Sequence, residues 1–206
     1  MKTCAVLSSL ATVLFSQAVA QTVDTVLTNR LTEPYGVAVE ANVHYITDSA
    51  AHRIVKFVPD SGAFSTLAGF AGRPGAVDAK GVYARFYNPR GIISVPALGG
   101  LVVADYANHT LRLVKLDGTT TTLAGSPGVP GLDAASVPAL SAHFNFPSGL
   151  AADSVGNLYI ADSKNNAIYR KWGIKKRTNE EMRADYIRRA KELVEGRFGL
   201  KLPAVH

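Results

Sequence analysis

Residues 101–125 read LVVADYANHTLRLVKLDGTTTTLAG, and the parts of this stretch recur along the chain. The recurring segments are PYGVAVEANVHYITDSAAHRIVKFV from Pro34, PRGIISVPALGGLVVADYANHTLRLV from Pro89 and PSGLAADSVGNLYIADSKNNAIYRK from Pro147. One aspartate returns every 57 residues, as Asp48, Asp105 and Asp162. Self-similarity at a fixed spacing is typical of a repeat architecture, so the sequence predicts one structural unit per repeat.

Each repeat has the pattern of a small antiparallel sheet. Short runs rich in β-branched and aromatic residues alternate with polar turns such as DSAAH, DYANH and DSKNN. The repeats lie near 34–69, 89–125 and 147–172, and only the third lacks a final TLAG strand. The first strand of each is mostly apolar, which predicts burial on both faces. A four-stranded sheet needs neighbours to cover its faces, so we expect an all-β fold, a partial β-propeller of about three blades.

The polar residues of the opening stretch recur with the repeat, which favours a structural role. The Asp carboxylate can accept backbone N–H groups of the hairpin that follows it. A second polar position can do similar work, and it is occupied by His52, His109 and Asn166. A catalytic triad would have to converge at one site instead of being dispersed over three blades. We therefore predict structural turn positions and no catalytic residue.

The repeats resemble the NHL-repeat family, and most closely its secreted bacterial type. The resemblance is carried by Pro-x-Gly at the first strand, by the TLAG strand with its Gly-Pro-rich linker, and by GNLYIAD at 156–162 and DYANHTLR at 105–112. It covers roughly residues 30–172 and implies NHL-type four-stranded blades, without implying an activity. Propellers of this family usually have about six blades, so the chain supplies an incomplete ring.

The N-terminus has the features of a signal peptide over residues 1–20. Lys2 precedes the apolar run AVLSSLATVLF, and Ala18-Val19-Ala20 is a small-x-small cleavage site. We therefore expect a secreted or periplasmic protein that starts at Gln21. Cys4, the single cysteine, lies in the removed part, so the mature chain would hold together without disulfides in an oxidising compartment.

The net charge of +6 is unevenly distributed along the chain. Residues 21–172 contribute +1 and residues 173–206 contribute +4. This balance argues against nucleic acid as a partner. We interpret the basic residues of the repeats as a solvated rim, namely Arg53, Arg90, Arg112 and Lys115.

The sequence offers one histidine as a candidate metal ligand. Relatives with NHL-like propellers resemble lyases or lactonases that hold Zn²⁺ or Ca²⁺ in the central channel. His44 stands where the other repeats have Leu101 and Leu158, but no His-x-x-x-His or Cys-x-x-Cys spacing occurs. We expect no cofactor and keep channel-bound Zn²⁺ or Ca²⁺ as the alternative. The sequon Asn108-His109-Thr110 falls in an expected exposed turn, and we interpret it as incidental.

The C-terminal residues 173–206 leave the repeat pattern and predict a basic helical tail. Thr178 to Glu181 form a capping box, and apolar residues at helical spacing follow, so we expect an α-helix at about 179–195. It can cap the last sheet, bind a partner or an anionic surface, or be of different origin.

The domain 21–172 is predicted to be an NHL-type propeller segment that acts as a binding or scaffold module. Its ligands would be a protein, a peptide or a glycan. The alternatives are a propeller lyase, lactonase or hydrolase with a channel metal, a truncated remnant of one, and a purely structural array. Self-assembly is a further expectation, because an incomplete propeller leaves sheet faces and edges open.

Overall fold

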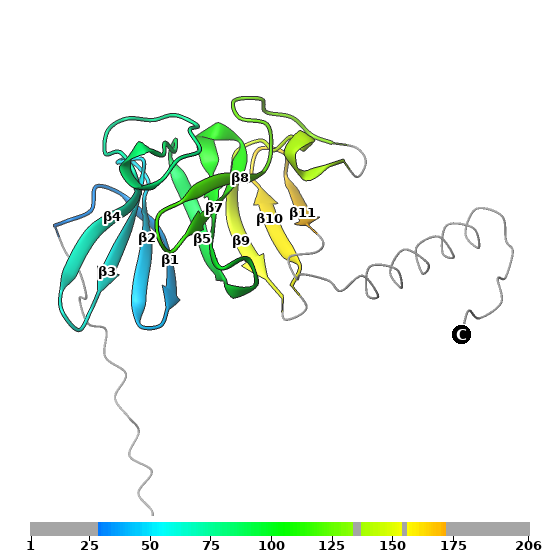
Figure 1. The fold of residues 1–206 in the computed structure, drawn as a ribbon. Coiled ribbons are helices and arrows are strands. Elements are labelled where there is room, and N and C mark those ends of the chain that lie inside the picture. The colour runs from blue at the N-terminus through cyan, green and yellow to red at the C-terminus, as the bar shows by residue number, and fades with distance from the viewer. Residues whose placement is uncertain (1–28, 134–136, 154–155, 172–206) are drawn as a thin grey trace, which may run out of the picture.

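Three antiparallel sheets stand side by side in a row (Figure 1). The computed structural model describes residues 29–133, 137–153 and 156–171. The strands of the first sheet are β1 (Pro34–Glu40), β2 (Val43–Asp48), β3 (Arg53–Val58) and β4 (Ala63–Gly69). Those of the second are β5 (Pro89–Val95), β6 (Gly100–Asp105), β7 (Thr110–Lys115) and β8 (Thr120–Ala124). Those of the third are β9 (Pro147–Ala152), β10 (Leu158–Asp162) and β11 (Ala167–Lys171).

Consecutive strands pair within each sheet, because short turns join them. The turn between β1 and β2 places Ala41 and Asn42 at φ 47° and 59°, a pair of left-handed residues that suits a tight hairpin. Short 3-10 helices lie in the connections, namely η1 (Gly81–Tyr83), η2 (Pro96–Leu98), η3 (Tyr106–Asn108) and η4 (Ala139–Ser141). The predicted all-β partial propeller is confirmed, with four strands in the first two blades and three in the described part of the third.

Other predictions lie outside the described residues. They concern the signal peptide at 1–20 and the C-terminal α-helix in the tail at 173–206. Within the described ranges, no helix is long and apolar enough to cross a membrane.

The first strands of the sheets form the inner edge of the row, since β1 contacts β5 and β5 contacts β9. Two glycines allow this approach. A Cβ on Gly36 would lie 2.6 Å from the Arg90 carbonyl oxygen, and one on Gly91 would lie 2.3 Å from the Ser148 carbonyl oxygen. Both distances are far below van der Waals contact, so the Pro-x-Gly glycines permit backbone to pack against backbone. The Thr47 hydroxyl adds a hydrogen bond to the Arg90 carbonyl at 2.6 Å.

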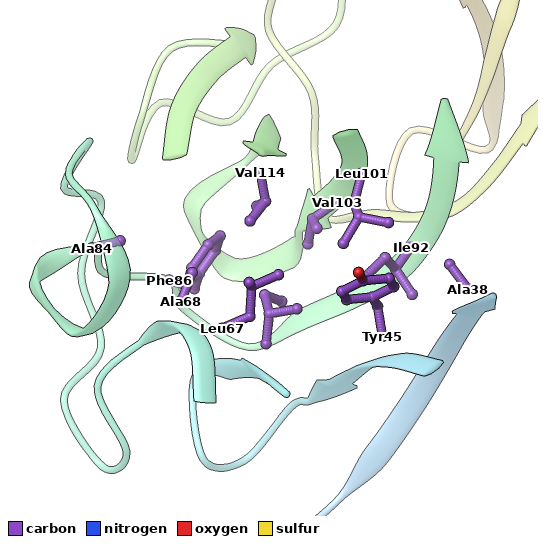
Figure 2. Packing of buried hydrophobic residues seen from close by; sticks show 11 residues of the cluster. Ala38, Tyr45, Leu67, Ala68, Ala84, Phe86, Ile92, Leu101, Val103 and Val114 are labelled. Carbon is purple, nitrogen blue, oxygen red and sulfur yellow. The ribbon is translucent and has the colours of Figure 1, made fainter. Parts of the chain in front are cut away.

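The hydrophobic core consists of the two interfaces between sheets. In β6, Leu101 and Val103 belong to the interface with the first sheet, whereas Val102 and Ala104 belong to the interface with the third. Figure 2 shows the first interface, where Tyr45 and Leu67 of one sheet meet Ile92, Leu101 and Val103 of the next. A fully buried Leu or Ile contributes roughly 1.5–3 kcal/mol. The stability of the fold therefore comes from packing between blades.

The predicted burial of the first strand on both faces is wrong for β1. Val37 is 61% exposed and Val39 is 56% exposed, and Tyr35 is exposed as well. The other side of β1 packs on the second sheet through Ala38. A first strand is covered on both faces only where a blade lies on each side, and the described residues place no blade before β1.

Candidate functional site

The repeated aspartates end the second strand of each sheet and are buried. Each accepts, through Oδ1, a backbone N–H from the segment just before its own first strand. The donors are Thr32 (2.8 Å) and Glu33 (3.0 Å) to Asp48, Tyr87 (2.7 Å) to Asp105 and Asn145 (2.7 Å) to Asp162. These differ from the expected partners in the following hairpin. The reason is the strand pairing, which sets Pro34, Pro89 and Pro147 opposite the three aspartates.

The second carboxylate oxygen accepts from an arginine in the first blade and from an asparagine at the same repeat position in the second and third blades. Asp48 accepts from Arg53 at 2.8 Å, and Asp162 accepts from Asn165 at 2.7 Å. Asp105 accepts from Asn108 at 2.7 Å and from Arg112 at 2.9 Å. Burial raises the pKa of Asp105 to about 6, although both of these donors oppose the rise. Burial also raises the pKa of Asp162. All three carboxyl groups are thus engaged in fixing linkers to sheets.

The histidines join one blade to the next. His52 and His109 have φ 57° and 59°, and Asn166 has the same left-handed conformation at φ 50°. The Nδ1 atom of His52 accepts the Asn88 N–H, and that of His109 accepts the Phe146 N–H, each at 3.2 Å. Both donors lie just before the first strand of the following sheet. The His109 ring also packs on Phe146, with centroids 4.5 Å apart.

Replacing His109 by asparagine should reduce the pH dependence of stability. Burial lowers the pKa of His109 from 6.5, so the folded chain holds fewer protons at this ring than the unfolded chain. Stability therefore falls as the pH drops below about 6.5, and protonation of Nδ1 also removes the acceptor for Phe146. Asn166 has the same backbone conformation, which argues that His109→Asn remains folded.

We expect the free energy of unfolding of His109→Asn at pH 8 to be about 1 kcal/mol below that of the wild type, the contribution of one hydrogen bond. Between pH 7 and pH 5 the free energy of unfolding should fall less in the variant than in the wild type. Urea unfolding at the three pH values measures both quantities. An identical pH slope in the two proteins would contradict the assignment of Nδ1 as an acceptor.

The other candidate residues are in structural contacts. His44 lies in β2 with its ring edge-on to Phe57, centroids 5.9 Å apart. His143 is paired with Asp133 in the second linker, at 3.0 Å between Nδ1 and Oδ1. Across the part of the chain that the structure describes, no three His, Cys, Asp or Glu side chains converge as a metal site.

The sequon does not lie in an exposed turn, contrary to expectation. Asn108 is 6% exposed, and its amide donates to Asp105 and to the Gly75 carbonyl. Thr110 is fully buried. Asn108 is therefore inaccessible in the folded chain, because this turn is covered by the preceding linker.

The predicted solvated rim of basic residues is also wrong in part. Arg112 is 1% exposed, and it binds Asp105, Asp78 and the carbonyls of Val77 and Arg85. Arg53 is paired with Asp48, and the Lys115 ammonium donates to the Leu98 carbonyl. Three of the four cations therefore hold the fold together, and Arg90 differs from them.

Arg90 lies in a row of side chains at the linker end of the innermost strands. We define the rim row as Tyr35, Arg90, Tyr106, Phe146, Ser148 and Ser163. It combines the middle residue of each Pro-x-Gly with residues of the neighbouring turns. Both linkers reach the same end of the sheets (Figure 1), so the row borders the linkers on the inner edge.

Aromatic rings hold the Arg90 guanidinium on two sides. Its Cζ lies 3.4 Å from the Tyr106 ring centroid and 4.9 Å from that of Tyr35, which is half exposed. Tyr106 in turn packs on Phe146, with centroids 4.7 Å apart. At the matching place in the third blade the two serines bond to each other at 2.5 Å. An arginine is therefore not required by the fold at this position.

The Arg90 charge is not neutralised by the described residues. Its Nε is buried and makes no hydrogen bond, and no described carboxylate forms an ion pair with it. A guanidinium stacked on a ring keeps its in-plane N–H groups free for an acceptor such as a carboxylate. The sequence did contain a signal for this site, because Arg90 and Tyr106 are the large residues at positions where the third repeat has Ser148 and Ser163.

Comparison with known proteins supports the fold. Residues 144–168 match the NHL repeat family. No curated protein sequence matches the chain. The chain is similar to an auxiliary nutrient binding protein from Bacteroides ovatus ATCC 8483, with 25% identity, a TM-score of 0.51, and coverage of 63% of this chain and 35% of that one.

Two structures from Bacteroides thetaiotaomicron VPI-5482 are similar at 26% identity. One is an auxiliary nutrient binding protein, with a TM-score of 0.54 and coverage of 65% of this chain and 36% of that one. The other is a structural genomics protein of unknown function, with a TM-score of 0.55 and coverage of 62% and 32%. The chain thus spans about a third of the length of these three solved structures.

Proposed function

We propose that this β-propeller segment, which matches the NHL repeat family at residues 144–168, is a secreted or periplasmic binding module whose ligand contacts the rim row. The observation that carries this proposal is the unneutralised Arg90 cation between two aromatic rings. The repeated aspartates and the histidines His52 and His109 are occupied in holding linkers and blades. Arg90 and its ring partners are free of that task, since the third blade folds with serines in their place.

The chemistry of the row favours an acidic oligosaccharide. The Arg90 guanidinium suits a carboxylate, the exposed Tyr35 ring suits the apolar face of a sugar, and the serine hydroxyls suit sugar hydroxyls. The two similar proteins named as nutrient binding proteins agree with ligand capture. Among protein, peptide and glycan ligands, we therefore put the acidic glycan first.

Calorimetric titration tests this assignment with oligogalacturonate, with a neutral galactan of similar length and with a glutamate-rich peptide. We expect oligogalacturonate to bind most tightly of the three ligands. Arg90→Met should weaken its affinity at least about tenfold, because a hydrogen bond to a charged group contributes about 1.5–3 kcal/mol. Arg73→Met is the matched control, because Arg73 stacks on Phe70 in the outer linker at 4.9 Å. Equal affinity of Arg90→Met, or preference for the peptide, would contradict the glycan assignment.

The alternative is an enzyme of the propeller lyase, lactonase or hydrolase type with a channel metal. Metal analysis of the purified protein separates the two. Stoichiometric Zn²⁺ or Ca²⁺ that is lost in His44→Ala would favour the enzyme, whereas the binding module predicts no such dependence on His44.

A further inference from the structure

The two interfaces inside the chain define which face of a blade meets the next. We name the face toward the following blade the back face and the opposite one the front face. The back faces of the first and second sheets present Ile54 and Leu111 at equivalent positions. The front faces of the second and third sheets present Ile92 and Leu150. The same packing pattern thus occurs twice.

The outermost faces carry the same residue types without a neighbour in the described part of the chain. On the front face of the first sheet, Val37 occupies the position of Ile92 and is 61% exposed. On the back face of the third sheet, Ile168 occupies the position of Ile54 and Leu111 and is 71% exposed. These apolar side chains are exposed at positions that are buried elsewhere in the repeat.

The third Pro-x-Gly glycine adds an independent observation. Gly36 and Gly91 are needed because a carbonyl of the next first strand approaches them. At Gly149 the nearest atom to an added Cβ is the Ala161 side chain at 3.3 Å, and no backbone carbonyl comes near. The third blade therefore has room beside Gly149 for another first strand. In the first two blades this place is filled, by β5 beside Gly36 and by β9 beside Gly91.

We propose that the back face of the third sheet receives the front face of the first sheet of a second copy of this chain. The contact continues the two interfaces already present, with Ile168 in the role of Leu111 and Val37 in the role of Leu150. Making it twice joins the three described blades of each copy into a closed ring of six, within the range of about four to eight blades known for propellers. Closure also brings Tyr35 of the second copy beside Ser148, which unites the two rim rows.

Solution mass tests the contact with the full chain and two exposed single variants. Sedimentation equilibrium should give twice the chain mass for the wild type. Val37→Lys and Ile168→Lys should each be monomeric, since one blocks every front face and the other every back face. Both positions are exposed, so folding is unaffected, which circular dichroism checks.

Mixing the two variants distinguishes this head-to-tail contact from any other. The back face of Val37→Lys and the front face of Ile168→Lys both remain intact, so the mixture should form a dimer. It should need a higher concentration than the wild type, because one interface replaces two. A monomeric wild type at millimolar concentration, association that survives either variant, or no dimer in the mixture would overturn the proposal.

Discussion

Gly91→Ala is expected to destabilise the chain by about 3 kcal/mol, which lowers the melting temperature by roughly 10 °C. The added Cβ would lie 2.3 Å from the Ser148 carbonyl oxygen, and the atom it meets is backbone. The clash cannot be relieved by a side-chain rotation, so β5 and β9 must move apart. That movement also loosens the apolar interface between the second and third sheets. Urea and thermal unfolding at low protein concentration measure the effect.

The chain offers its own control in Gly149→Ala. This glycine has the same place in the repeat, but its added Cβ meets only the Ala161 side chain at 3.3 Å. We expect the free energy of unfolding to fall by less than about 1 kcal/mol, because the Ala161 side chain can shift by a few tenths of an ångström. An equal loss of stability in the two variants would mean that each glycine is needed for the conformation of its own strand. That result would contradict the close approach of neighbouring blades.

Arg112→Met is expected to cost about 3–5 kcal/mol, the range for removing one partner of a buried ion pair. Arg112 binds Asp105 and Asp78 and two carbonyls of the first linker, so its loss leaves Asp105 buried without its cation. Arg53→Met is the control. Its partner Asp48 is equally buried, but Arg53 is partly exposed, and water can replace it at a smaller cost.

The loss in Arg112→Met should depend on pH. Burial already raises the pKa of Asp105 to about 6 in the wild type, and removal of Arg112 raises it further. A carboxyl group with a raised folded pKa binds more protons in the folded chain, so stability increases as the pH falls toward 4. Arg112→Met should therefore recover part of its stability between pH 7 and pH 4.5. A loss that stays constant over this range would mean that Asp105 is not the group left unpaired.

The repeat allowed the fold to be predicted from the sequence. Three copies of one pattern define the strand order, the turn positions and the need for neighbouring sheets, and these are properties of local sequence. Asp48, Asp105 and Asp162 could be recognised as equivalent for the same reason. Their partners could not, since Tyr87 and Asn145 reach them through strand pairing across 18 and 17 residues.

Burial of charged residues was the harder problem. Arg53 and Arg112 look alike in sequence, but Arg53 is at the start of β3 and Arg112 lies inside β7, between the linker and the sheet. The same linker covers Asn108. Neither linker has a periodic pattern that would place it on the sheet, so the sequence left Arg112 and the sequon at the surface.

The candidate site depended on a break in the repeat. Charge alone places Arg90 in a basic rim with the other cations of the repeats. Its contact with Tyr106 lies beside the pair formed by Pro89 and Asp105, where the regular pairing of β5 with β6 is interrupted. The signal for this pair in the sequence is that Arg90 and Tyr106 replace the serines of the third repeat, Ser148 and Ser163.

Amide hydrogen exchange by NMR gives the most direct test of the central claim, that buried polar side chains tie the linkers to a row of stacked sheets. The amides of Tyr87 and Asn145, which precede the first strands of their blades and are bound by Asp105 and Asp162, are the informative probes. If the two aspartates hold these segments, both amides exchange as slowly as the strand amides of β6. Exchange at the rate of an exposed loop would contradict it.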